Sequence, residues 1–143
     1  MACLVLAQCK SSPGSDKEIS GYNFLSPESS IFLPAILREV SGIVMVDSSS
    51  LACIQDENGI VFFYDLEMKK ITKQINFGPD GDYEGIARAA DTLYVLRSDG
   101  FVYGIKDFRS DSYNVISYQT EIPSKDNEGI CYDSHNRRLL IAC

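Results

Sequence analysis

A five-residue segment returns three times along the chain and restricts the fold more than any other feature. It occupies residues 39–43, 82–86 and 126–130, which read Glu-Val-Ser-Gly-Ile, Asp-Tyr-Glu-Gly-Ile and Asp-Asn-Glu-Gly-Ile. The three glycines recur with a period of about 43 residues, and each copy leads into an apolar stretch. A period of about 40 to 45 residues with strand-like content is typical of a β-propeller blade. The repeat therefore predicts an all-β chain built as a β-propeller.

Each repeat has the same order of apolar runs and polar turns, so each predicts one four-stranded blade. Asn58-Gly59 is a strong hairpin signal between two such runs. The expected strands of the first repeat are residues 43–46, 51–54, 60–65 and 70–75, and those of the second are 85–88, 93–96, 101–105 and 113–118. The third repeat supplies only 129–132 and 139–142, and residues 31–33 suggest a further edge strand.

The sequence therefore predicts a partial propeller of about two and a half four-stranded blades. Closed propellers usually have about four to eight blades, because closure removes exposed strand edges. We expect the sequence to be a fragment of a longer protein. The alternative is a small all-β domain that pairs with a second copy of itself.

The N-terminal region divides into two short parts before the propeller domain of residues 22–143. Residues 1–9 resemble the end of a truncated bacterial lipoprotein signal, in which the apolar run from Leu4 closes on Cys9. Residues 10–21 are rich in Ser, Gly and Lys and are expected to form a linker. This pattern predicts a lipid anchor at Cys9 and a location at the cell envelope, either periplasmic or associated with the plasma membrane. The alternative is an N-terminal tail with an incidental thiol.

Composition narrows the classes of partner. The 143 residues are 45% hydrophobic, enough for a core, and carry a formal net charge of −7. That charge argues against nucleic acid, whose phosphates require a basic surface. It suits a cationic ligand, although it also simply keeps a protein soluble. The five cysteines contain no Cys-x-x-Cys pair, so a metal–thiolate site has no support.

The acidic residues of the repeated segment are the candidate metal ligands. In a propeller, equivalent positions of successive blades surround one axis, so Asp82, Glu84, Asp126 and Glu128 are expected to converge, with Glu39 from the first blade. Clustered carboxylates either raise one another's pKa values or bind a cation. Calcium is the natural cation, since it takes about six to eight oxygen ligands in flexible geometry. The alternative is that each carboxylate orders its own turn by accepting backbone N–H bonds.

Three other residues modify this hypothesis. Ser41 stands where the other two copies have glutamate, which weakens the contribution of the first blade. His135 is the only histidine and falls in a polar turn, so neither a zinc site nor a catalytic triad is favoured. Arg97 ends a strand and is expected to pair with a neighbouring carboxylate, with an anionic ligand as the alternative.

The order of these motifs resembles one known family. Glu-Val-Ser-Gly-Ile, Gln-Asp-Glu-Asn-Gly, Gly-Asp-Tyr-Glu-Gly-Ile-Ala, Leu-Tyr-Val-Leu-Arg-Ser-Asp-Gly and Asn-Glu-Gly-Ile-Cys-Tyr-Asp follow one another as in the SdiA-regulated (YjiK/CarP-like) family of bacterial β-propellers. The resemblance covers residues 22–143. It implies a propeller that is exported or membrane-associated, often as a lipoprotein, related to esterase-like phytase propellers and associated with calcium. No reaction is firmly attached to that family.

Together these observations predict a calcium-binding, non-enzymatic binding or signalling module at the cell envelope, with an unknown small-molecule or protein ligand. The alternative is a calcium-dependent phosphoesterase or phytase-like hydrolase, in which the metal would polarise a phosphoryl oxygen and activate water. The sequence leaves open whether the protein is an enzyme, and it assigns no catalytic residue.

Overall fold

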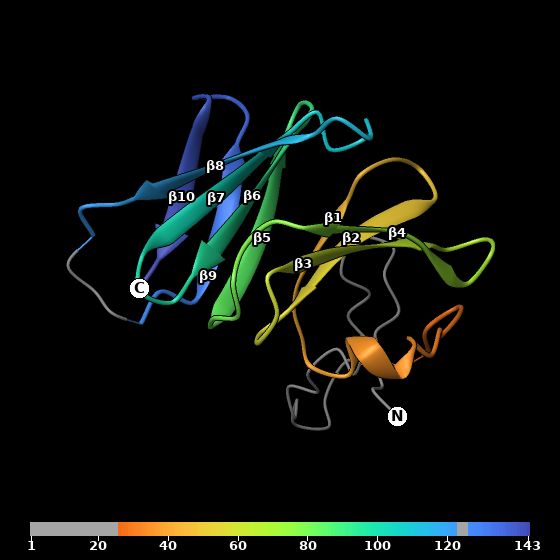
Figure 1. Cartoon of the computed structure of the whole chain (residues 1–143). Helices are drawn as coiled ribbons and strands as arrows, with labels where there is room; N and C mark the ends of the chain where they lie inside the picture. The colour runs from red at the N-terminus through yellow and green to blue at the C-terminus, as the bar shows by residue number, and fades with distance from the viewer. Residues whose placement is uncertain (1–25, 123–125) are drawn as a thin grey trace, which may run out of the picture.

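The computed structural model describes residues 26–122 and 126–143, which are all-β apart from one short 3-10 helix (Figure 1). The expectations for residues 1–21 lie outside the described residues. The elements are η1 (Ala35–Leu37), β1 (Val40–Met45), β2 (Ser50–Gln55), β3 (Ile60–Asp65), β4 (Lys70–Asn76), β5 (Tyr83–Ala89), β6 (Thr92–Arg97), β7 (Phe101–Lys106), β8 (Asn114–Gln119), β9 (Gly129–Asp133) and β10 (Arg138–Ala142).

The strands form three successive antiparallel sheets, one for each sequence repeat. We call the sheet β1-β2-β3-β4 blade 1, the sheet β5-β6-β7-β8 blade 2, and the hairpin β9–β10 the half-blade. In each sheet the strands follow their order in the chain, as in a propeller blade. The prediction of about two and a half four-stranded blades is confirmed. Among the described residues, no helix is long and apolar enough to cross a membrane.

The segment before blade 1 differs from its prediction. Residues 31–33 pair with no strand, and η1 follows immediately after Pro34. Proline lacks the N–H that a ladder requires, and its fixed φ suits the start of a helical turn. Leu37 of η1 is instead fully buried beside Phe62 and Tyr64 of β3, so the segment covers one face of blade 1 without joining its sheet.

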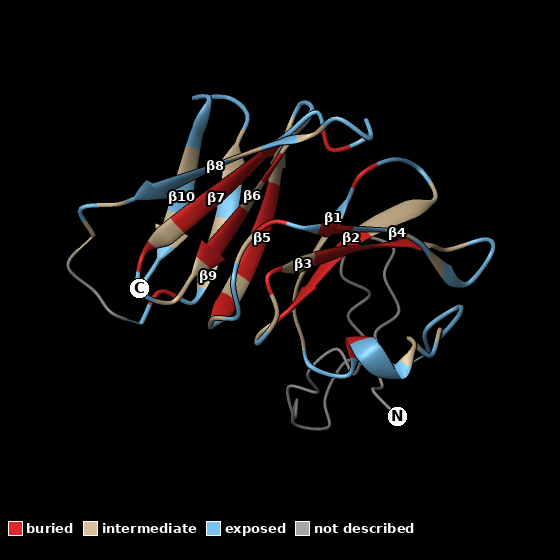
Figure 2. Cartoon of the chain, in the orientation of Figure 1, coloured by how far each residue is buried: buried red, intermediate tan, exposed pale blue. Residues whose placement is uncertain are grey.

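The main hydrophobic core lies between blade 1 and blade 2. Phe63 and Ile75 from blade 1 share one buried cluster with Leu93, Val95 and Ile105 from blade 2. Figure 2 shows the result, with β5, β6 and β7 largely buried and β8 and β10 mostly exposed or half-buried. Burial of this apolar area is the main force that stacks the two blades.

The innermost strands approach one another most closely at the repeated glycines. A Cβ atom built on Gly42 would lie 2.9 Å from the backbone nitrogen of Ile86, and one on Gly85 would lie 3.1 Å from that of Ile130. The isoleucine of the next repeat thus packs directly against the Cα of each glycine. Any side chain on the glycine would force the two strands apart. The glycine and isoleucine of the motif are complementary halves of one contact between successive blades.

Backbone hydrogen bonds fix the same stacking register. The N–H of Tyr83 donates to the carbonyl of Asp56 in blade 1 at 2.8 Å, and the N–H of Asn127 donates to the carbonyl of Ser98 in blade 2 at 3.1 Å. Tyr83 and Asn127 occupy the same position in their repeats, as do Asp56 and Ser98. The N–H at the start of each later blade therefore donates to the carbonyl that follows the second strand of the preceding blade.

We predict that Gly42→Ala and Gly85→Ala destabilise the protein, because the added methyl group meets the backbone of the next blade. Overpacking of this kind typically costs about 1–3 kcal/mol in the free energy of unfolding, which urea denaturation measures. Gly129→Ala is the matched control, since its Cβ would meet only the Ala142 Cβ at 3.9 Å. Equal losses at all three glycines would show that the close approach does not explain them, because the lower unfolded-state entropy of alanine would by itself stabilise the protein.

Candidate functional site

The acidic corners lie at strand bulges. Tyr83 pairs with Arg97 and Gly85 with Leu96, so Glu84 is an extra residue that the register skips. Blade 1 has the same shift, where Val40 pairs with Gln55 and Gly42 with Ile54, leaving Ser41 as the extra residue. A bulge redirects the side chain of its extra residue out of the regular alternation, and bulges are common beside functional sites.

The structure brings together the acidic residues of blade 2 and the half-blade. The pKa of Glu84 is raised above its ordinary value, first by partial burial, next by a hydrogen bond with Asp82, and then by the negative charges of Asp82, Glu128 and Asp126. All of these principal causes act in the same direction. Four carboxylates from two successive repeats therefore share one electrostatic neighbourhood, which we call the acidic corner (Asp82, Glu84, Asp126 and Glu128).

Glu39, the fifth candidate, has an exposed side chain at the corresponding position of blade 1. Its charge is not among the principal causes of the raised pKa of Glu84. Its backbone carbonyl accepts a hydrogen bond from the N–H of Asp56 at 3.3 Å. Glu39 therefore marks the corner of blade 1 without a demonstrated contact to the other four carboxylates.

The acidic corner is open rather than preassembled as a cage. Asp82, Asp126 and Glu128 are exposed, and Glu84 is half-buried. Among the described residues, no three His, Cys, Asp or Glu side chains stand in an arrangement that holds a metal ion. Mutual repulsion keeps ionised carboxylates apart, so this set can bind a cation only if its exposed members turn inward.

Blade 1 presents oxygen atoms of a different kind near its own corner. Ser41 Oγ, Gln55 Oε1 and Asp56 Oδ1 are buried and have no hydrogen-bond partner in the structure. They lie at the start of β1 and the end of β2, which meet at one end of the blade. Gln55 and Asp56 lie outside the repeated segment, and the sequence analysis placed them only in the Gln-Asp-Glu-Asn-Gly motif, without a role as buried oxygen donors.

Arg97, which pairs with Tyr83 beside the acidic corner, is engaged within its own blade. Its guanidinium donates to Asp99 at 2.9 and 2.7 Å and to the Tyr103 hydroxyl at 3.2 Å, and it lies 4.6 Å over the Phe101 ring. The guanidinium holds the pKa of Asp99 below its ordinary value. The expected pairing with a neighbouring carboxylate is confirmed, and Arg97 orders the β6–β7 turn.

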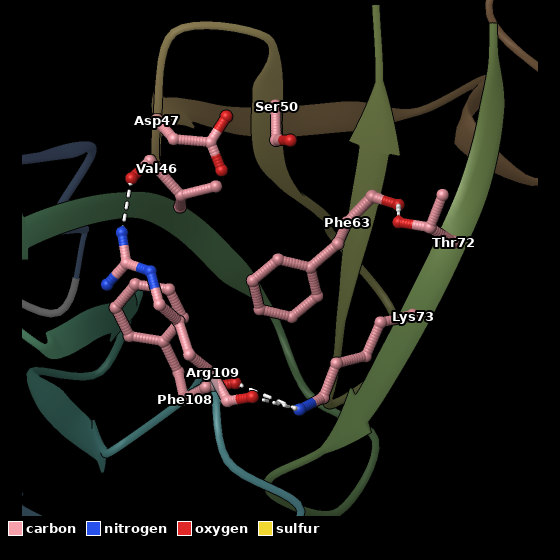
Figure 3. A pocket seen from close by; sticks show the side chains of 8 residues that line it. All are labelled: Val46, Asp47, Ser50, Phe63, Thr72, Lys73, Phe108 and Arg109. Carbon is pink, nitrogen blue, oxygen red and sulfur yellow. Dashed lines mark hydrogen bonds between the residues drawn. The ribbon is translucent and has the colours of Figure 1, made fainter. Parts of the chain in front are cut away.

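A cavity of about 220 Å³ lies between blades 1 and 2 at the end of β1 (Figure 3). Its two cations hold the blades together. Lys73 Nζ of β4 donates to the carbonyls of Phe108, Arg109 and Ser110 at 3.1, 3.3 and 2.8 Å, and Arg109 donates to the Val46 carbonyl. These bonds pair both cations with protein oxygens, so the cavity is not favoured as an anion site. We call Lys73, Arg109 and their carbonyl partners the cross-blade latch, because they join blade 1 to blade 2.

Comparisons with solved structures identify the class of fold. The chain is similar to part of a mitotic checkpoint complex structure (19% identity, TM-score 0.58, 71% of this chain and 30% of that chain). It is also similar to virginiamycin B lyase from Staphylococcus aureus (16%, 0.55, 73% and 34%) and to hydrazine synthase from Kuenenia stuttgartiensis (20%, 0.58, 86% and 33%). The chain spans about a third of the length of each. These likenesses show a β-propeller fold and nothing finer.

No family model matches the sequence. No curated protein matches it either. The described residues thus form a partial β-propeller.

We predict that, without added divalent cations, the contribution of Glu84 to the stability of the protein becomes more favourable on mild acidification. Because the pKa of Glu84 is higher in the folded than in the unfolded chain, ionisation of this carboxyl favours unfolding. The favourable contribution of its protonated form is complete below the ordinary glutamate pKa of about 4.3 and disappears as pH rises through the raised folded value.

Melting curves in a chelator, from pH 4 to pH 8, measure this effect. Glu84→Gln should raise the melting temperature at pH 7 and bring it closer to the wild-type value at pH 4, because the amide carries no charge. Glu67→Gln, in the exposed β3–β4 turn, is the control. A Glu84→Gln protein that melts at the wild-type temperature across this range would show that the charges of the corner do not couple.

Proposed function

We propose that the chain is the calcium-binding part of a β-propeller of the SdiA-regulated kind, acting as a non-enzymatic binding or signalling module. The observation that carries the proposal is the shared neighbourhood of Asp82, Glu84, Asp126 and Glu128. Asp82 and Glu84 come from one repeat and Asp126 and Glu128 from the next, so the proximity of the two pairs is a product of blade stacking. Four carboxylates without a neutralising cation are costly to hold together.

The chemistry of the donors favours calcium over other metals. All four side chains offer carboxylate oxygens, and calcium accepts irregular sets of oxygen ligands at about 2.3–2.6 Å. Zinc prefers nitrogen and sulfur, and His135 lies in the exposed β9–β10 turn. Glu39 would take part only as an outer ligand, because Ser41 replaces the inner glutamate of its repeat. A bound ion would join blade 2 to the half-blade at their innermost strands.

The experiment is thermal unfolding of the whole chain with increasing calcium chloride. Ligand that binds only the folded state stabilises it by RT ln(1 + [L]/Kd), about 2.7 kcal/mol when calcium exceeds Kd a hundredfold. We expect Glu84→Gln and Glu128→Gln to abolish this rise, whereas Glu67→Gln should retain it. Magnesium at equal ionic strength controls for charge screening. A melting temperature that ignores calcium, or a rise that both variants retain, would exclude the site.

An activity assay on the same protein tests the hydrolase alternative. A calcium-dependent phosphoesterase would release phosphate from a phosphate monoester only when calcium is present. Calcium binding without turnover supports the non-enzymatic proposal, and turnover that disappears in Glu84→Gln replaces it by the hydrolase.

We further propose that the protein is attached to the cell envelope by a lipid on Cys9. The support is the sequence alone, where a short apolar run closes on a cysteine and a polar linker follows. Expressed from its natural gene in the source bacterium, the wild-type protein should sediment with membranes and take up labelled fatty acid. Cys9→Ser should lose the label and become soluble, while Cys3→Ser serves as control. Equal fractionation of both variants would contradict the anchor.

A further inference from the structure

The β2–β3 turn contains the only asparagine of the chain that is followed by glycine. Asn58 is half-buried, and its side-chain Nδ2 donates to Asp80 Oδ1 at 3.3 Å. The turn closes through the N–H of Ile60, which donates to the Asn58 carbonyl at 2.7 Å, while the N–H of Gly59 has no hydrogen-bond partner among the described residues. No hydrogen bond therefore holds the Gly59 nitrogen away from the side chain of Asn58, and asparagine is a chemically labile residue.

Packing leaves glycine as the only residue that fits at position 59. A Cβ atom there would lie 2.3 Å from the carbonyl oxygen of Gly78 and 2.7 Å from that of Pro79. Because glycine has no Cβ, no side chain shields its backbone nitrogen from the preceding residue. The close approach of the two segments thus requires the residue that leaves this nitrogen sterically accessible.

The same turn holds the connection that leads from β4 to β5, and so from blade 1 to blade 2. The N–H of Phe77 donates to the Gly59 carbonyl at 2.8 Å, and the N–H of Gly81 donates to the Glu57 carbonyl at 2.8 Å. We call these four residues the joint (Glu57, Gly59, Phe77 and Gly81). Asn58 lies between its two acceptors, so a change in the main chain at position 58 alters the spacing of both carbonyls.

We propose that Asn58 is a site of spontaneous deamidation, with the Gly59 nitrogen as nucleophile and water as the second reactant. This nitrogen attacks Asn58 Cγ, so that a Cγ–N bond forms and the Cγ–Nδ2 bond breaks. The Nδ2 group leaves as ammonia with the proton of the Gly59 N–H, and a cyclic succinimide remains. Water then hydrolyses either C–N bond of the ring. Cleavage at Cγ gives aspartate, and cleavage at the main-chain carbonyl gives isoaspartate, in which the peptide continues through Cγ.

Both products weaken the joint between the blades. Aspartate at position 58 replaces the amide that donates to Asp80 by a second carboxylate, so attraction becomes repulsion. The exposed side chain of Glu57 adds charge of the same sign. Isoaspartate also inserts one extra main-chain atom between the carbonyls of Glu57 and Gly59, which hold the connection to blade 2. The modification therefore loosens the contact between blades 1 and 2 at this turn.

The first experiment is incubation of the folded whole chain in warm, mildly alkaline buffer, followed by proteolysis and mass spectrometry. The mass gained when an amide becomes a carboxyl group measures deamidation at each asparagine. Asn136 is the matched control, because it also lies in a hairpin turn and its Nδ2 donates to Asp133 Oδ2 at 2.7 Å, but arginine follows it. We expect Asn58 to react at least about tenfold faster than Asn136, a difference of about 1.4 kcal/mol in activation free energy.

Two further measurements test the product and its effect. An isoaspartate-specific carboxyl methyltransferase with labelled S-adenosylmethionine should label the incubated wild type more than Asn58→Gln, whose longer side chain cannot form the five-membered ring. Asn58→Asp reproduces the aspartate product and should melt at a lower temperature than Asn58→Ser, which loses the bond to Asp80 without adding charge. High salt should narrow this difference by screening the repulsion. Asn114→Asp, on the exposed part of β8, controls for the added charge.

Three results would overturn the proposal. The first is deamidation of Asn58 that is no faster than that of Asn136. The second is deamidation of Asn58 in the urea-unfolded chain but not in the folded chain, since the fold would then hold the reacting atoms apart. The third is an Asn58→Asp protein that melts at the same temperature as Asn114→Asp, because the product would then leave the joint intact.

Discussion

The close approach of innermost strands at Gly42 and Gly85 is the constraint on which the rest of this structure depends. With no side chain on the glycine, the next blade can place its isoleucine directly against the Cα. That contact sets the distance between blades. The bonds from the N–H groups of Tyr83 and Asn127 then set their relative height. Distance and height together determine which side chains of successive repeats become neighbours.

The acidic corner follows from the same constraint. Glu84 stands directly before Gly85, so packing that glycine against Ile130 also brings Glu84 toward Glu128. The position that stacks the blades thus accumulates like charge, which opposes folding when all the carboxylates are ionised. Ser41 removes this repulsion at the corner of blade 1. Retention of glutamate in the other two repeats has a physical explanation if a cation offsets the repulsion there.

Much of the fold could be predicted from the sequence because its signals are local and repeated. The Asn58-Gly59 turn and the alternating apolar residues located β3 and β4 to within about one residue. Repetition then placed the acidic residues at equivalent sites. The bulges at Ser41 and Glu84 were not predictable, because a bulge is a shift between two strands and leaves no mark on one of them. The role of Lys73 was missed for a similar reason, since its three carbonyl partners lie in another blade.

Three basic side chains of the two blades bind groups other than the acidic corner. Arg97 is held by Asp99, Arg109 by Asp91 and the Val46 carbonyl, and Lys73 by the carbonyls that close the cross-blade latch. In these positions the basic side chains order turns and join blades. None of them figures among the principal causes of the pKa shift of Glu84, all of which raise it. Because a positive charge close to a carboxylate lowers its pKa, a cation bound from solution beside Glu84 would offset the causes that raise it.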